Sequence, residues 1–204
     1  NNITNEIWQL QENLTYCAAL TSDSLLFTGG WVQKPAIDGW NLYLTKLSPT
    51  TGEVLLDTIY NYYFNTQYKT NWIQDIAATP DGGAYLLATV NYSGDTGDIA
   101  LIKIDSLGNW QWHQVYDLNP LYWFSTDVAG GLYVDSNGNI IFSCRRYFPN
   151  DNTYAYIYKL NQDHSIAWIN NENFLEGEGT NIVELVTGDI VIGGSSFPTS
   201  TFPY

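Results

Sequence analysis

The stretch LIKIDSLGNWQWHQVY, residues 101–116, decides the fold of this 204-residue chain. Apolar and polar side chains alternate in its first part, residues 105–109 (DSLGN) supply turn-forming side chains, and the alternation then resumes. Alternation with a period of two is typical of a half-buried strand, and a short Gly- and Asn-containing connection between two such runs is typical of a β-hairpin. The stretch therefore predicts two antiparallel strands joined by a tight turn.

The same hairpin recurs along the chain. A lysine precedes each turn, and these lysines, 57 and 56 residues apart, are Lys46, Lys103 and Lys159. A large apolar residue follows each turn, at Leu56, Trp112 and Trp168. Recurrence at equivalent positions favours structural roles for these tryptophans and lysines, with each lysine stem covering apolar surface.

A second hairpin alternates with the first. Its four copies are AALTSDSLLFTGG (18–30), AATPDGGAYLLAT (77–89), LYVDSNGNIIFSC (132–144) and VELVTGDIVIGGS (183–195). Two hairpins make a four-stranded unit of about 50–57 residues, and no stretch has a convincing helical period. Four-stranded units with this repeat length are typical of the blades of a β-propeller.

We therefore predict an all-β propeller of four-stranded antiparallel blades, in which neighbouring blades bury each other's faces. The predicted divisions of this single domain are the last strand of a preceding blade (1–13), three blades (14–60, 71–116, 126–170) and the first hairpin of a further blade (180–204). An open blade leaves unpaired sheet edges, so we expect an incomplete ring within a longer chain. A four-bladed ring closed by the N-terminal strand, and a β-sandwich or other stack of sheets, are the alternatives.

The composition excludes some classes of binding partner. The chain has 7 Lys and Arg against 21 Asp and Glu, a net charge of −14, which is unsuited to nucleic acid because phosphate binding needs clustered cations. No apolar run approaches the roughly 18 residues of a membrane span, so we expect no membrane insertion. The two cysteines, Cys17 and Cys144, are too few for a disulfide framework or a zinc site and are expected to be small buried apolar residues.

Two motifs resemble known families. Asp105, Gly108 and Trp112 form D-x-x-G-x-x-x-W, which resembles the tryptophan-docking motif of quinoprotein-like propellers, where the tryptophan is structural. TPDGGAYLLAT followed by DIALIKIDSLGNWQWHQVY resembles the repeat propellers of secreted bacterial surface proteins, many of which carry a sorting domain for type IX secretion. The second resemblance covers nearly the whole chain and implies a propeller that is secreted or displayed on the cell surface. It implies no particular activity.

Successive turns of antiparallel blades alternate between two rims, so the short turns share one rim and the long connections the other. The long-connection rim is rich in aromatic residues and arginine, which suit a protein partner or a glycan. The candidate binding residues are Trp31, Trp40, Tyr62, Tyr63, Tyr92, Tyr122, Trp123, Arg145, Arg146 and Tyr147. The alternative is that these side chains fold inward and cover the ends of the blades.

No nucleophile elbow, phosphate loop or paired histidine motif is present, so we expect a non-catalytic binding or structural module without a cofactor. A weak calcium candidate is the loop with Asp95 and Asp98, while residues 135–139 are explained as a turn. His113 and His164 are expected to be packed or solvated. One alternative is a carbohydrate-active propeller, a glycan binder, hydrolase or lyase, in which carboxylates converge. Another is a structural subunit of a surface or secretion-associated complex.

Overall fold

The computed structural model describes residues 12–33, 39–60, 70–92, 97–116, 126–147, 153–170 and 177–196. Regular secondary structure within these ranges is entirely β. The structure therefore confirms the all-β class, and within the described ranges no helix is long and apolar enough to cross a membrane.

The strands form three four-stranded antiparallel sheets and one two-stranded sheet, each in sequence order. The first sheet contains β1 (Glu12–Leu20), β2 (Leu26–Gln33), β3 (Trp40–Leu47) and β4 (Val54–Tyr60). The second contains β5 (Thr70–Ala78), β6 (Ala84–Tyr92), β7 (Asp98–Ile104) and β8 (Trp110–Tyr116). The third contains β9 (Thr126–Val134), β10 (Ile140–Tyr147), β11 (Thr153–Leu160) and β12 (Ile166–Asn170), and the fourth β13 (Gly177–Glu184) and β14 (Ile190–Ser196).

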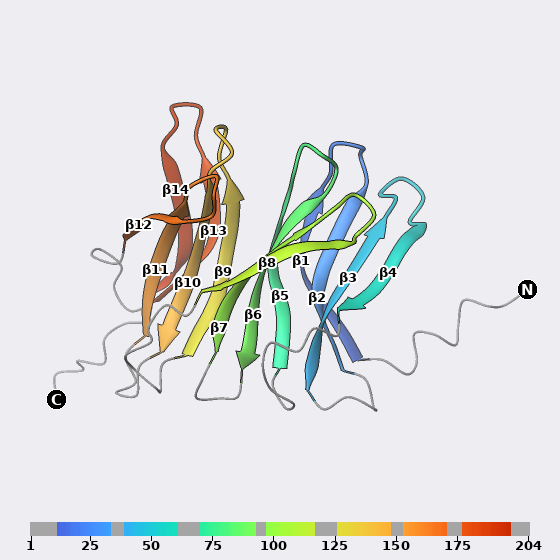
Figure 1. Cartoon of the computed structure of the whole chain (residues 1–204), viewed down its shortest axis with the longest axis horizontal. Coiled ribbons are helices and arrows are strands. Elements are labelled where there is room, and N and C mark those ends of the chain that lie inside the picture. Colours follow the sequence, from blue (N-terminus) through green and yellow to red (C-terminus); the bar gives the residue numbers. More distant parts are fainter. Residues whose placement is uncertain are drawn as a thin grey trace, which may run out of the picture.

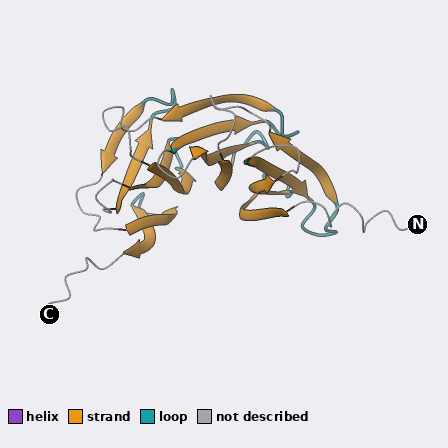
Figure 2. Cartoon of the chain, turned by 90° about the horizontal axis from the view of Figure 1, so that it is seen from below, coloured by secondary structure: helices purple, strands orange, loops and turns teal. Residues whose placement is uncertain are grey.

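The sheets stand side by side along an open arc (Figure 2). The first strand of each sheet packs on the face of the sheet before it: β5 contacts β1, β2 and β3, β9 contacts β5, β6 and β7, and β13 contacts β9, β10 and β11. This confirms the incomplete propeller-like arrangement of four-stranded blades. The strand expected within residues 1–13 falls mostly on residues 1–11, outside the described part of the chain.

Strand register confirms the predicted alignment of the repeats. Lys46, Lys103 and Lys159 lie opposite Leu56, Trp112 and Trp168 in the outer strands. On their other side the three lysines lie opposite Phe27, Tyr85 and Ile141. These nine positions are therefore equivalent in three blades and lie on the same face of each sheet.

Six of the seven short turns share one geometry. In each, the first residue donates its N–H to the fifth residue's carbonyl, and the fourth residue donates to the first, as in Asp105–Asn109. The fourth residue has a positive φ in every case: Ser24, Gly82, Gly108, Gly138, His164 and Gly188. Glycine suits this left-handed position because it lacks a Cβ, so Ser24 and His164 are exceptions.

The core lies between the sheets. One apolar cluster joins the first and second sheets through side chains such as Leu44 and Ile102, and another joins the second and third through Leu101 and Phe142. A Cβ on Gly29 would lie 2.9 Å from atoms of Ile73 and Ile76, so glycine lets β5 approach the first sheet closely. Cys17 and Cys144 are free thiols; Cys144 is buried, as expected, whereas Cys17 is half-buried.

Candidate functional site

The long connections begin and end at one rim of the sheets, at the bottom of Figure 1, and the short turns lie at the other. Of the candidate residues, Tyr62, Tyr63, Tyr122, Trp123 and Asp95 lie outside the described residues, as does the side chain of Tyr92. The geometry below concerns the remaining candidates, which sit at strand ends along this long-connection rim.

Three tryptophans from two sheets meet at this rim. Trp31 in β2 stacks on Trp40 in β3, with ring centroids 4.3 Å apart and planes inclined by 11°. Trp72, near the start of β5, meets Trp40 edge-on with centroids 6.0 Å apart. Hairpin register explains the stack: Trp31 pairs with Leu42 and Trp40 with Gln33, so the two indoles are diagonal neighbours on one face.

The cluster is ordered by hydrogen bonds as well as by stacking. The indole N–H of Trp31 donates to the Tyr16 hydroxyl at 2.7 Å, and that of Trp72 donates to Oε1 of Gln74 at 3.0 Å. Trp31 is only 7% exposed, whereas Trp40 and Trp72 are half-buried and Tyr16 is exposed. The result is a fixed aromatic surface with a phenol and an amide at its edge.

Arg146 belongs to a buried ion pair. Its Nε and Nη2 donate to the two carboxylate oxygens of Asp127 at 2.7 and 3.1 Å, and its guanidinium lies 4.7 Å from the centroid of Tyr156. Both partners are about 95% buried. Burial alone would lower the pKa of Arg146, but hydrogen bonding to and the charge of Asp127 outweigh it and raise that pKa above its usual value. The buried ion pair thus connects the neighbouring strands β9 and β10 of the third sheet.

Arg145 lies on the opposite face of β10, because successive residues of a strand alternate. Its guanidinium is 5.1 Å from the ring centroid of Tyr147, two residues further on. Both side chains are half-buried. The rim of the third sheet therefore carries a cation stacked on an aromatic ring, a second feature suited to recognition.

Asp98, one of the two calcium candidates, accepts a hydrogen bond from Nδ2 of Asn91 at 3.0 Å. Within the described ranges, no three His, Cys, Asp or Glu side chains are close enough together to hold a metal ion. The described part of this loop is therefore a hydrogen-bonded strand connection. Calcium binding through Asp95 and Asp98 stays a prediction.

The two histidines pack against aromatic rings. The His164 ring lies with its centroid 4.1 Å from that of Trp112, and His113 lies 5.4 Å from Trp110. Partial burial lowers the pKa of both imidazoles, because desolvation penalises the charged form. Both rings therefore favour the neutral form and a packing role.

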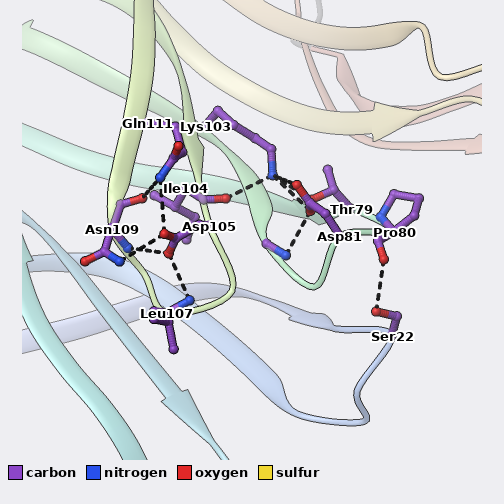
Figure 3. A network of polar contacts seen from close by, with 11 residues as sticks. Ser22, Thr79, Pro80, Asp81, Lys103, Ile104, Asp105, Leu107, Asn109 and Gln111 are labelled. Atoms are coloured by element: carbon purple, nitrogen blue, oxygen red, sulfur yellow. Dashed lines mark hydrogen bonds and ion pairs between the residues drawn. The ribbon is translucent and has the colours of Figure 1, made fainter.

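The recurring lysines connect residues of the short-turn rim, and Figure 3 shows the contacts of one of them, Lys103. Lys103 Nζ donates to the Thr79 hydroxyl and the Ile104 carbonyl, and forms an ion pair of 3.0 Å with Asp81. Lys46 pairs with Asp23, the third residue of its turn like Asp81, at 3.1 Å, and Lys159 pairs with Asp135, the first residue of its turn, at 3.0 Å. The pairing of these aspartates with the lysines was not predicted from the sequence, although each aspartate precedes its lysine by 22 to 24 residues, a recurrence that could have revealed it.

Tyrosines of the outer strands connect neighbouring sheets. The Tyr60 hydroxyl donates to the Gly108 carbonyl of the second sheet at 2.5 Å, and Tyr116 donates to the His164 carbonyl of the third sheet at 3.2 Å. Both acceptors are the left-handed residues of an outer turn. Sheets and short turns therefore form a rigid frame beneath the long-connection rim.

The frame defines a repeat protein of four-stranded, propeller-like blades. No protein-family model matches the chain, and no curated protein matches it. Among solved structures, the chain is similar to a protein of unknown function from Bacteroides caccae, with 11% sequence identity and a TM-score of 0.43. The match covers 89% of this chain and 71% of that one.

Proposed function

We propose that this chain is a non-catalytic interaction module that binds a protein partner through its long-connection rim. The observation that carries the proposal is the cluster of Trp31, Trp40 and Trp72, held by stacking and by hydrogen bonds to Tyr16 and Gln74. Tryptophan, tyrosine and arginine contribute most to protein interfaces. Side chains already fixed by a rigid frame lose little conformational entropy when a partner binds.

A glycan is the second candidate ligand, and the half-buried ring of Trp40 favours it. This ring is stacked on Trp31 and met edge-on by Trp72, and its exposed part offers apolar surface of the kind on which a sugar ring packs. The Tyr16 hydroxyl accepts from Trp31 and retains its own hydrogen for donation. Sugar hydroxyls would therefore find a donor beside the apolar surface.

The test compares Trp40→Ala with the matched control Trp110→Ala, which removes a half-buried indole at the short-turn rim. Wild-type and variant chains are cross-linked to the surface proteins of the source cells and, separately, applied to arrayed oligosaccharides. We expect one ligand to be retained by the wild type and the control and lost by Trp40→Ala. Loss in the control alone, or equal retention by all three chains, would refute binding through the rim.

A non-catalytic role makes a separate prediction. An identified oligosaccharide ligand is expected to remain intact after prolonged incubation with the chain, as measured by the release of reducing ends. Release that is lost on replacing a carboxylate would instead identify a hydrolase or lyase.

We further propose that the module acts outside the cell, either free or as a subunit of a surface or secretion-associated complex. The support is the resemblance of residues 79–116 to secreted repeat propellers and the excess of acidic over basic residues. Immunodetection in cell fractions is expected to find the protein in the medium or at the surface, and in neither after type IX secretion is disabled. Detection in the cytoplasm alone would contradict this location.

A further inference from the structure

The two polar side chains that contact the tryptophan cluster both come from β-bulges. The pairing of β1 with β2 shifts by one residue at Tyr16, and the pairing of β5 with β6 shifts by one residue at Gln74. These two strands are the first strands of neighbouring sheets and contact each other. A bulge changes the direction of the side chain it carries, and here it brings each side chain to an indole.

The hydrogen bonds of the cluster leave it rich in donors. The Tyr16 hydroxyl accepts from Nε1 of Trp31, and Oε1 of Gln74 accepts from Nε1 of Trp72. Within the described part of the chain, nothing accepts from the Tyr16 hydroxyl hydrogen, the Gln74 amide or Nε1 of Trp40. Tyr16 is 50% exposed, and the nitrogens of Gln74 and Trp40 are not buried. Three donors are therefore available to a ligand.

The matching ligand is rich in acceptors and poor in donors. The Tyr16 hydroxyl and Oε1 of Gln74 already accept from indoles, so a ligand donor buried beside them competes for occupied acceptors, and an unpaired donor weakens binding. A sugar hydroxyl and an ordinary peptide unit each bring a donor together with an acceptor. A proline residue brings a main-chain carbonyl and no N–H.

The indoles suit the shape of a proline-rich segment. The planes of Trp40 and Trp72 are inclined by 66°, with centroids 6.0 Å apart, so their exposed parts face different directions. A polyproline II helix advances about 3.1 Å per residue and makes no internal hydrogen bonds, so two residues span this distance and keep their carbonyls available. Its rings pack on aromatic side chains, and its conformation is fixed before binding.

We propose that the partner of the long-connection rim presents a proline-rich segment in the polyproline II conformation, whose carbonyls accept from Tyr16, Trp40 and Gln74. The inference rests on the proposed function, because it names the chemistry of the partner bound at the same rim. The net charge of −14 favours lysine or arginine beside the prolines. In the third sheet the bulge of β9 consists of Gly130 and Gly131, which have no side-chain donors, so the first two sheets hold the segment.

The test measures the affinity of the 204-residue chain for synthetic peptides by isothermal titration calorimetry. We expect binding of an uncharged oligoproline, and no binding of a peptide of equal length in which alanine and glycine replace proline. An oligoproline flanked by lysines is expected to bind more tightly than the uncharged one at low salt. Equal affinity for the proline and the alanine–glycine peptides would overturn the proposal.

Two variants remove single donors. Gln74→Glu keeps the acceptor for Trp72 and loses the amide N–H groups, and Trp40→Phe keeps an aromatic ring and loses Nε1. Each is expected to lower the association constant for the uncharged oligoproline about five- to tenfold. Gln114→Glu is the matched control, because it makes the same change of charge at an exposed position of β8 and is expected to bind like the wild type. Unchanged near-UV circular dichroism of Gln74→Glu shows that the cluster is intact.

Failure of this inference can be told apart from failure of rim binding. A cell-surface ligand that the wild type retains and Trp40→Ala loses, together with no affinity for oligoproline, would overturn the proline-rich segment and leave the proposed function standing. Oligoproline binding that both Gln74→Glu and Trp40→Phe leave unchanged would overturn the inference as well, because the donors would then have no part in recognition.

Discussion

Replacing Gly108 by alanine tests how closely neighbouring blades approach. Gly108 has φ = 78°, and a Cβ there would lie 2.3 Å from Cδ2 of Leu56 in the first sheet. Gly138 holds the same turn position in the third sheet with φ = 80°, but a Cβ there meets nothing closer than 3.9 Å. The two substitutions therefore share the backbone penalty and differ in the contact between blades.

The expected magnitudes follow from these distances. A left-handed conformation costs a non-glycine residue about 1–2 kcal/mol, which is the whole expected effect of Gly138→Ala. Carbon atoms in contact stand about 3.5–4.0 Å apart, so Gly108→Ala also forces Leu56 to move by more than about 1 Å. Overpacking costs about 1–3 kcal/mol, and we expect the low end of this range because the contact is with the end of a half-buried leucine side chain, giving about 2–3 kcal/mol in total for Gly108→Ala.

Urea unfolding, monitored by tryptophan fluorescence, measures the free energy of unfolding of each glycine variant. An unchanged slope of this free energy against urea concentration shows that each variant exposes the same surface area on unfolding. In a Leu56→Ala background, Gly108→Ala is expected to cost no more than Gly138→Ala, because the space is then open. Equal costs of the two glycine substitutions in the wild-type background would refute the close approach of the blades at Gly108.

Three further predictions concern buried and charged groups. Arg146→Ala is expected to destabilise the chain by about 3–5 kcal/mol in urea unfolding, because it leaves the buried Asp127 carboxylate unpaired, and replacing both residues by apolar ones is expected to cost less. Hydrogen bonding from Thr79, with a further contribution from Lys103, lowers the pKa of Asp81 to about 2, below the ordinary value of about 3.9. The Asp81 carboxylate therefore contributes to the free energy of unfolding above about pH 4, and this contribution is lost as the pH falls toward 2. Because Asp81 is 61% exposed, Asp81→Asn is expected to lower the free energy of unfolding by less than about 1 kcal/mol at pH 7. Below pH 2 the same substitution is expected to have no effect. Burial raises the pKa of both Cys17 and Cys144, so a thiol reagent at pH 8 is expected to label neither in the native chain and both in denaturant; rapid native labelling would contradict this burial.

The fold could be predicted because its signal is local. Within residues 105–109, Asp105 accepts hydrogen bonds from main-chain N–H groups of the turn, and Gly108 adopts the left-handed conformation. Alternating apolar and polar residues flank this turn on both sides, so a short stretch of sequence defines the hairpin. Recurrence of the lysine before that turn, at spacings of 57 and 56 residues, then indicates blades. The position of Lys103 opposite Trp112 follows from the hairpin alone.

Contacts between different sheets could not be predicted from the sequence pattern of single hairpins. Alternation shows that Trp40 and Trp72 lie in strands but does not show that they meet, because they belong to different sheets. His164 occupies a position that turn chemistry would assign to glycine, and its ring packs on Trp112 of the neighbouring sheet. The buried pair of Arg146 with Asp127 depends on which face of β10 meets the second sheet, which one strand's pattern leaves undetermined.

The tyrosine contacts between blades bear on how far the repeats can diverge. Tyr60 and Tyr116 donate to main-chain carbonyls, and one acceptor belongs to a glycine and the other to a histidine. Every residue type supplies a carbonyl, so mutation of the acceptor residue preserves the contact as long as the turn keeps its shape. Copies of the unit can therefore drift apart in sequence over evolutionary time, and a search based on residue identity would lose them before their architecture changed.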